Sequence, residues 1–120
     1  MNVFIVDDDP EMIEVMTLLL DAAGHRVSSS VAGATAIPRI AAFQPDILLT
    51  DLVMAELDGL ALCHELRENK GLKAMNIAFV SAKTDDYWRK RADSAGAVGY
   101  IAKPIDTDTF VETVEALAAV

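Results

Sequence analysis

The 120-residue sequence contains a single cysteine, Cys63, which excludes an intrachain disulfide and a cysteine-based metal site. Basic residues are also scarce: 10 lysines and arginines stand against 19 acidic residues, giving a net charge of −9. This negative surplus argues against direct nucleic-acid binding by the chain. No apolar run is long enough to span a bilayer, and no secretory signal pattern is present. We therefore expect a cytoplasmic protein that does not engage a membrane.

The chain has no internal repeat, low-complexity tract or linker, so we expect residues 1–120 to form one domain. Hydrophobic residues make up 52% of the sequence and charged residues 24%, which is typical of a well-packed globular protein. Cys63 lies in an apolar helical stretch, where a buried thiol is expected.

Short apolar runs alternate with longer segments of helical periodicity, which is the pattern of a parallel sheet covered on both faces. The runs at 3–6, 47–50, 77–80 and 99–102 predict strands, and the more polar stretch 26–31 predicts an edge strand. With right-handed crossovers, these segments predict an α/β fold with one five-stranded parallel sheet flanked by five helices. The expected strand order is the flavodoxin-like 2-1-3-4-5.

The ends of the five predicted helices can be assigned from local signals. The first begins after an Asp9 cap with Pro10 at its first position, and it ends at Gly24. The second covers about 34–43, with Pro38 expected within its first turn or so. The third follows Asp58-Gly59 and ends near 69–71, and the fourth runs from Thr84 to Gly96. The fifth starts at 107–109, with Glu112 placed for a capping box if Thr109 is the cap.

Each of four predicted strands is followed by a polar residue that can take part in phosphoryl chemistry. The first runs into Asp7-Asp8, the third into Asp51, the fourth into Ser81 and the fifth into Lys103. Parallel strands place these residues at one sheet edge, where the crowded carboxylates require a cation such as Mg²⁺. One carboxylate can then accept a phosphoryl group, whose oxygens an ammonium and a hydroxyl stabilise.

Each of these residues alone also has an ordinary structural explanation. Consecutive aspartates after a strand often form a turn and a helix cap, and Asp9 fits that role. Lys103 and Ser81 are unremarkable in loops and at strand ends. Their joint placement favours a functional site.

With these motifs, the chain resembles a receiver domain of bacterial two-component response regulators over essentially its whole length. The residues that carry the resemblance are Asp7-Asp8, Asp51, Asp58-Gly59, Ser81-Ala82 and Lys103-Pro104, together with the intervals between them. The resemblance implies a phosphoacceptor switch similar to chemotaxis regulators. It would be no enzyme beyond its own Mg²⁺-dependent autophosphorylation and autodephosphorylation.

The resemblance also implies a role for individual positions at the acidic end of the site. Asp51 would be the phosphoacceptor, paired with Lys103. Asp8 and Asp51 would bind Mg²⁺, with Mn²⁺ as an alternative ion. The backbone carbonyl of Val53 would complete the coordination, and Asp7 would act through water.

The remaining implied roles concern the switch and the peptide bond after Lys103. Ser81 would bind a phosphoryl oxygen, and Tyr100 would turn inward when Ser81 moves. The Lys103-Pro104 peptide is expected to be cis, as in the family.

Three positions either depart from the family pattern or are ones at which the family varies the rate of phosphoryl-group loss. Ala55 stands where the family commonly has proline, which frees the loop backbone. Val53 and Lys83 occupy positions through which the family tunes the lifetime of the phosphoryl group. Because an apolar Val53 cannot orient an attacking water, we predict slow self-hydrolysis.

Partners follow from the resemblance and from the segment 87–91, Tyr-Trp-Arg-Lys-Arg. A sensor histidine kinase or histidine phosphotransfer protein would supply the phosphoryl group. The basic, aromatic segment is either a solvated helix face or a contact surface. In the family, helix 4, strand 5 and helix 5 form a surface for a homodimer or an output domain.

Three other readings of the sequence remain open. A Mg²⁺-dependent phosphohydrolase would need a second acid where Val53 stands. A flavodoxin-type cofactor site would have a phosphate cradle instead of Asp7-Asp8-Asp9. The intact acid, hydroxyl and lysine set argues against a receiver-like module that has lost phosphorylation. The cognate kinase, and whether the chain is a whole regulator or part of one, are not given by the sequence.

Overall fold

The computed structural model describes residues 1–54, 58–72 and 75–120 and shows a five-stranded parallel sheet within them. Its order is β2-β1-β3-β4-β5, as predicted, with β2 at an edge. The strands are β1 (Asn2–Val6), β2 (Arg26–Ser30), β3 (Ile47–Thr50), β4 (Asn76–Ser81) and β5 (Gly99–Ala102). The helices are α1 (Pro10–Ala22), α2 (Gly33–Phe43), α3 (Gly59–Glu68), α4 (Asp86–Ser94) and α5 (Phe110–Ala118), with a 3₁₀ turn at Lys70–Leu72.

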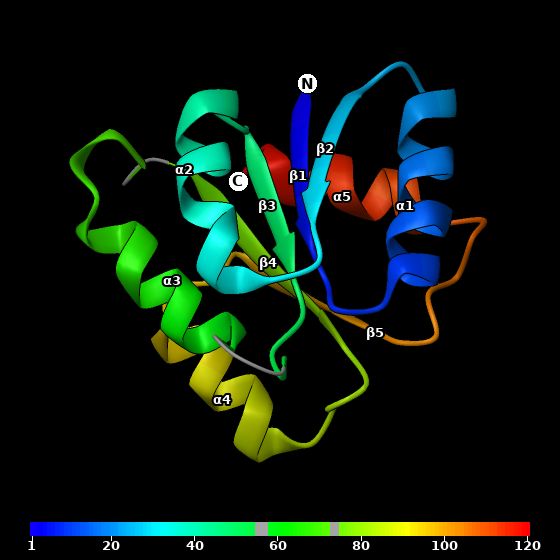
Figure 1. Ribbon diagram of the computed structural model, residues 1–120. Helices are drawn as coiled ribbons and strands as arrows, with labels where there is room; N and C mark the ends of the chain where they lie inside the picture. The colour runs from blue at the N-terminus through cyan, green and yellow to red at the C-terminus, as the bar shows by residue number, and fades with distance from the viewer. Residues whose placement is uncertain (55–57, 73–74) are drawn as a thin grey trace.

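The sheet is the middle of three layers (Figure 1). Helices α1 and α5 cover one face, where Met16, Leu20 and Phe110 pack on β1, β3 and β4. Helices α2, α3 and α4 cover the other face, and Ile40 and Leu66 belong to its core. Because β1, β3 and β4 are covered on both faces, their residues are almost all apolar and buried. Cys63 lies buried in α3, as expected.

The strand register brings the functional strand ends to one edge of the sheet. Val6 pairs with Thr50, so the residues that follow them, Asp7 and Asp51, leave neighbouring strands at the same level. In the same way Ser81 pairs with Ala102, the residue directly before Lys103. Side chains separated by up to 96 positions in the sequence therefore meet at this edge.

The predicted start of α1 is confirmed. The Asp9 side chain accepts a hydrogen bond from the Glu11 N–H at 3.0 Å, and Pro10 is the first helical residue. Gly24 follows the helix with a φ of 90°, a conformation that glycine adopts without steric cost. Asp58 likewise caps α3 by accepting from the Ala61 N–H at 2.8 Å.

Two other predicted helix starts differ from the structure. Helix α4 begins at Asp86 and is capped by Asp85, whose side chain accepts from the Trp88 N–H, and not by Thr84. Thr109 does precede α5, but its side chain makes no capping hydrogen bond. The Thr109 N–H already donates to the Asp106 carbonyl at 3.2 Å, so the capping box with Glu112 does not form.

Pro38 lies deeper in α2 than the sequence suggested. The helix begins at Gly33, which makes Pro38 its sixth residue. Proline cannot donate the hydrogen bond that the Ala34 carbonyl would normally receive. Ala34 and Pro38 are both exposed, so water can replace that bond while buried Ile40 holds the helix to the core.

The end of α5 is fastened to the beginning of β4 by one side chain. The Asn76 amide donates to the carbonyls of Leu117 at 3.1 Å, Ala118 at 3.0 Å and Val120 at 3.4 Å. Leu117 and Ala118 belong to the last turn of α5, whose carbonyls lack the usual partner one turn further along the helix, so Asn76 adds a donor where the helix ends. None of the helices in the described ranges combines the length and apolar character needed to cross a membrane.

Candidate functional site

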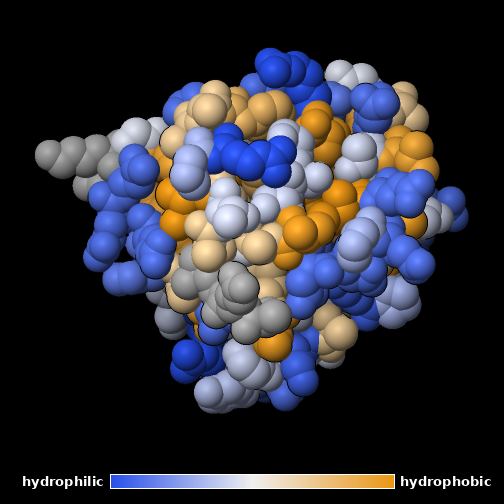
Figure 2. All heavy atoms as spheres, viewed as in Figure 1, coloured by the Kyte–Doolittle hydropathy of each residue, from blue (hydrophilic) through white to orange (hydrophobic). Residues whose placement is uncertain are grey.

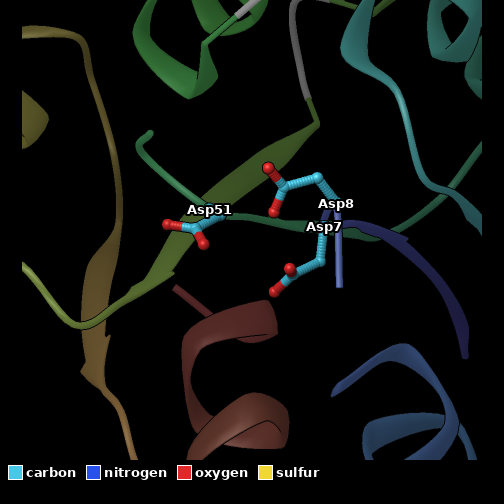
Figure 3. A group of neighbouring side chains, drawn as sticks. All are labelled: Asp7, Asp8 and Asp51. Carbon is cyan, nitrogen blue, oxygen red and sulfur yellow. The ribbon is translucent and has the colours of Figure 1, made fainter. Parts of the chain in front are cut away.

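Three carboxylates gather at the C-terminal edge of the sheet. Asp7 and Asp8 follow β1, and Asp51 follows the adjacent β3. One oxygen from each carboxylate lies within 4.8 Å of the other two, and Figure 3 shows the three side chains close together. Asp7 is buried, Asp51 is partly buried and Asp8 is exposed, so the cluster opens toward solvent on the side of Asp8.

Lys103 bridges two members of this acid cluster. Its Nζ donates to Asp7 Oδ2 at 2.8 Å and to Asp51 Oδ2 at 2.9 Å. Burial alone would lower the pKa of Lys103, but the hydrogen bonds and charges of Asp7 and Asp51 outweigh it and raise the pKa. Lys103 is therefore a fixed cation, with one ammonium proton left to bind another oxygen. The peptide bond that follows it, Lys103-Pro104, is cis, as expected.

Asp7 is the most enclosed of the three acids, with 1% of its surface exposed. Burial raises the pKa of Asp7, while the hydrogen bonds from Lys103 and from the Asp9 N–H act in the opposite direction. Its Oδ1 accepts that backbone hydrogen bond at 3.0 Å. Because both oxygens already have donors, Asp7 is better placed to hold a water than to bind an ion alone.

The donor set fits a hard divalent cation. Three carboxylates within 4.8 Å repel one another, and Lys103 pairs with only two of them. Oxygen ligands without sulfur or imidazole suit Mg²⁺, which usually takes one or two carboxylates and keeps several waters. Asp8 and Asp51 can supply those carboxylates while Asp51 keeps a second oxygen for chemistry.

Two more polar side chains lie beside the acid cluster. Ser81 is the last residue of β4, and Tyr100 lies within β5. Ser81 is 1% exposed, and its Oγ accepts a hydrogen bond from the Lys83 N–H at 3.1 Å. The Tyr100 hydroxyl is buried and makes no hydrogen bond of normal geometry within the described residues. Burial raises the pKa of Tyr100, and the nearby Ser81 hydroxyl partly opposes this effect.

A contact from α4 holds the ring of Tyr100. The guanidinium carbon of Arg89 lies 4.9 Å from the ring centroid, and its Nε donates to the Thr84 carbonyl at 3.0 Å. Arg89 thus connects the loop after Ser81 to the aromatic ring on β5. This contact was not predicted from the sequence, where Arg89 was only part of a basic segment.

Val53, in the β3–α3 connection, and Gly59, the first residue of α3, border Asp51. The Val53 N–H lies 3.4 Å from Asp51 Oδ1, and the Val53 side chain is 47% exposed. The Gly59 N–H donates to the Leu52 carbonyl at 2.9 Å, and a Cβ on Gly59 would lie 2.0 Å from the Asp51 carbonyl oxygen. Only glycine allows α3 to approach this closely. The Asp58-Gly59 pair predicted the start of a helix, but it did not predict that Gly59 would pack against the Asp51 backbone. Ala55, where the family commonly has proline, lies outside the described residues.

The basic segment of α4 forms part of the surface. Tyr87 is 60% exposed, whereas Trp88 is partly buried against the core. A cavity of about 480 Å³ between α3 and α4 is lined by Leu60, Tyr87, Lys90, Arg91, Ser94 and Ala95. Exposed Tyr87 and the cationic side chains of Lys90 and Arg91 line this cavity, which is consistent with a contact surface on α4.

A doubly wound sheet with an acid cluster, a hydroxyl and a bridging lysine at its C-terminal edge defines a receiver-type signalling domain. The family model of the response regulator receiver domain matches residues 3–115. The chain is 32% identical to protein PilH of Pseudomonas aeruginosa, covering 98% of both chains. It therefore belongs to the response regulator receiver family, and such domains are signalling switches that bind Mg²⁺ in an acidic pocket.

Other relatives are longer than this chain. The match to the DNA-binding dual master transcriptional regulator RpaA of Synechocystis is 27% identical and covers 97% of this chain but 48% of RpaA. Among solved structures, chemotaxis protein CheY4 of Vibrio cholerae superposes with a TM-score of 0.91 over 97% of both chains. At 22% identity, CheY4 establishes the fold alone.

Proposed function

We propose that this receiver domain is a phosphorylation-dependent switch in which Asp51 takes a phosphoryl group from a phosphohistidine. The donor would be a sensor histidine kinase or a histidine phosphotransfer protein, the partners with which receiver domains interact. The observation that supports this most directly is the Asp51 carboxylate, which lies within 4.8 Å of Asp7 and Asp8 and is held by Lys103 at 2.9 Å.

In the proposed transfer, an Asp51 oxygen attacks phosphorus, the phosphorus–nitrogen bond breaks, and the donor imidazole leaves and takes up a proton. Asp8, Asp51 and the Val53 carbonyl would hold Mg²⁺, with Asp7 reaching it through water. When bound, the ion would neutralise charge on the phosphoryl oxygens. Lys103, already oriented by Asp7 and Asp51, would bind one oxygen, and the Ser81 hydroxyl would bind another.

The output of the switch would lie on α4, β5 and α5. When Ser81 turns toward the phosphoryl group, it would leave its hydrogen bond with the Lys83 N–H, which now measures 3.1 Å. The Tyr100 ring would turn inward with it; its hydroxyl is already buried and has no hydrogen bond within the described residues. The change would reach α4 through Arg89 and alter a surface for an output domain or a second copy.

Beyond accepting and losing its own phosphoryl group, we propose no enzymatic activity for the chain. The phosphohydrolase alternative requires an acid where the exposed Val53 stands. A cytoplasmic location remains a prediction, as does the extent of the domain over residues 1–120.

The decisive experiment is incubation with acetyl phosphate and Mg²⁺ followed by intact mass spectrometry. We expect one added phosphoryl group, which disappears with EDTA or with Asp51→Ala. Asp58→Asn is the matched control, because asparagine also caps α3 and the residue lies outside the acid cluster. Phosphorylation that persists in Asp51→Ala would refute the assignment.

A further inference from the structure

A second polar site lies between the edge strand β2 and helix α2. Arg26, Ser28, Arg39, Ala42 and Phe43 line a cavity of about 340 Å³ there, which we call the Arg26–Arg39 pocket. Figure 2 shows strongly hydrophilic side chains lying among apolar ones over α2 and β2. The pocket contains no acidic residue although the whole chain carries a charge of −9, so it is a local concentration of positive charge.

Both guanidinium groups are held in place by aromatic rings. The guanidinium carbon of Arg26 lies 5.2 Å from the centroid of Phe43, and that of Arg39 lies 5.6 Å from the centroid of Phe4. The two rings contact each other edge to face, with centroids 6.0 Å apart. These cation–π contacts bias the arginines toward this arrangement before any ligand arrives, which reduces the entropy lost on binding.

The hydrogen-bonding capacity of the two arginines is largely unused. Arg39 donates from Nη1 to the Ser29 carbonyl and from Nη2 to Ser28 Oγ at 3.2 Å, which leaves three of its five N–H groups. Arg26 makes no side-chain hydrogen bond or ion pair within the described ranges. Neither arginine has a carboxylate partner among the described residues.

Ser28 adds an oriented hydroxyl donor. Its Oγ already accepts from Arg39, so its own proton is available to a ligand. On a strand, Arg26 and Ser28 project from the same face, toward α2 and Arg39. Two guanidinium groups and one hydroxyl provide donors for a group with three oxygens and two negative charges.

We propose that the Arg26–Arg39 pocket binds a phosphate monoester, a site separate from the acid cluster around Asp51. A phosphate group presents three acceptor oxygens with a charge near −2 at neutral pH, and arginine binds it in a forked geometry. The pocket is open to solvent, so the esterified group can extend beyond it. The edge position of β2 keeps the pocket open to solvent.

The test is an amide chemical-shift titration of the full chain with O-phosphoserine, with inorganic phosphate and glutarate in parallel at matched ionic strength. EDTA is present so that the acid cluster cannot retain phosphate through a metal ion. We expect saturable shifts confined to residues 26–30 and 39–43. Phosphoserine and inorganic phosphate compare the ester with the free anion, and glutarate supplies a dicarboxylate of the same charge.

Variants of Arg26 connect the shifts to the pocket. Arg26→Gln should weaken phosphoserine binding about tenfold, since it removes charge-assisted hydrogen bonds. Arg26→Lys should restore part of the affinity, because it keeps the charge but not the fork. Arg91→Gln is the matched control, with the same loss of charge on α4, and should bind as the wild type does. Because the Arg26 guanidinium makes no hydrogen bond that the fold needs, Arg26→Gln should remain folded.

Two results would overturn the proposal. Equal affinity of wild type and Arg26→Gln would show that the anion binds elsewhere or through general electrostatics. Glutarate binding as tight as phosphoserine would show that the pocket does not select phosphate. Because the titration uses EDTA and needs no phosphorylation of Asp51, neither result depends on the proposed switch.

Discussion

At the scale of single residues, Asp7 carries the strongest electrostatic conflict of the site. Burial raises its pKa above the ordinary value of 3.8, so the folded state favours the protonated carboxyl. Its contribution to stability is therefore present at pH values below 3.8 and is lost as the pH rises through the folded pKa. Above the folded pKa and without metal, the ionised form of Asp7 is less favourable to the folded state than the protonated form.

Replacing this carboxylate should therefore stabilise the metal-free protein. In EDTA at pH 7, we expect Asp7→Asn to unfold at a higher temperature than the wild type, with a difference that shrinks as the pH approaches 3.8. Thermal melts across this pH range measure the effect. Asp108→Asn, which removes an exposed charge, is the control. A lower midpoint for Asp7→Asn at pH 7 would mean that its ion pair with Lys103 outweighs burial.

A second prediction at this scale concerns the lifetime of the phosphoryl group. The apolar Val53 side chain is 47% exposed beside Asp51 and cannot position a water. We expect slow decay of phosphorylated protein in Mg²⁺, and acceleration by about tenfold or more in Val53→Asn, since an oriented water attacks more readily. Phosphate release after removal of the donor measures both rates. Val31→Asn changes another exposed valine and should have no effect; wild-type decay within seconds would contradict the prediction.

At the scale of elements, the approach of α3 to the end of β3 depends on Gly59. A Cβ at this position would lie 2.0 Å from the Asp51 carbonyl oxygen, a backbone atom that cannot swing aside. We expect Gly59→Ala to destabilise the protein by about 1–3 kcal/mol through overpacking. In Gly71→Ala the nearest atom, Asn69 Oδ1, would lie at 3.6 Å, so this matched substitution should be milder. Urea unfolding compares the two, and equal losses would remove the steric explanation.

The starts of the helices were only partly predictable from the sequence. The start of α1 was predictable because Asp9 and Pro10 act through local geometry. The start of α4 was not, because Thr84 and Asp85 are both competent caps, and in the structure it is the Asp85 side chain that makes the capping hydrogen bond. The capping box at the start of α5 does not form because the Thr109 N–H that Glu112 would bind already donates to the Asp106 carbonyl.

The same distinction applies to the site. Strand ends and the expected parallel strand order were enough to predict that Asp7, Asp8, Asp51 and Lys103 would meet. The burial of Asp7 and the bond of Lys103 to it depend on the packing of neighbouring strands and helices, which the sequence does not state. The contact between Arg89 and Tyr100 likewise joins two elements through rotamers that local patterns do not specify.

At the scale of the whole molecule, a net charge of −9 and an acid cluster both make stability depend on cations. Mg²⁺ bound only by the folded state should stabilise it by about 2.7 kcal/mol at a concentration of 100 times its dissociation constant. For a domain of this size the midpoint should rise by about 10 °C. Melts with MgCl₂ and with NaCl at equal ionic strength separate specific binding from screening.

Variants of neighbouring aspartates make this test specific. Asp8→Asn should lose most of the Mg²⁺-dependent rise, because the residue lies in the cluster. Asp9→Asn should keep it, because Asp9 caps α1 and asparagine caps helices as well. An equal rise in NaCl, or a full rise in Asp8→Asn, would mean that the cluster does not hold the ion.

The Asn76 hydrogen bonds have a practical consequence for observing this protein. They anchor the last turn of α5 at the amino end of β4, whereas the acid cluster lies at the carboxyl end of the sheet. Val120 is 77% exposed at that anchored end. A fluorophore or surface tether attached at Val120 would therefore lie at the opposite end of the sheet from the acid cluster and leave Asp51 accessible to the proposed phosphoryl donor. Single-molecule and immobilised-binding measurements could use that point of attachment without masking the chemistry they are meant to follow.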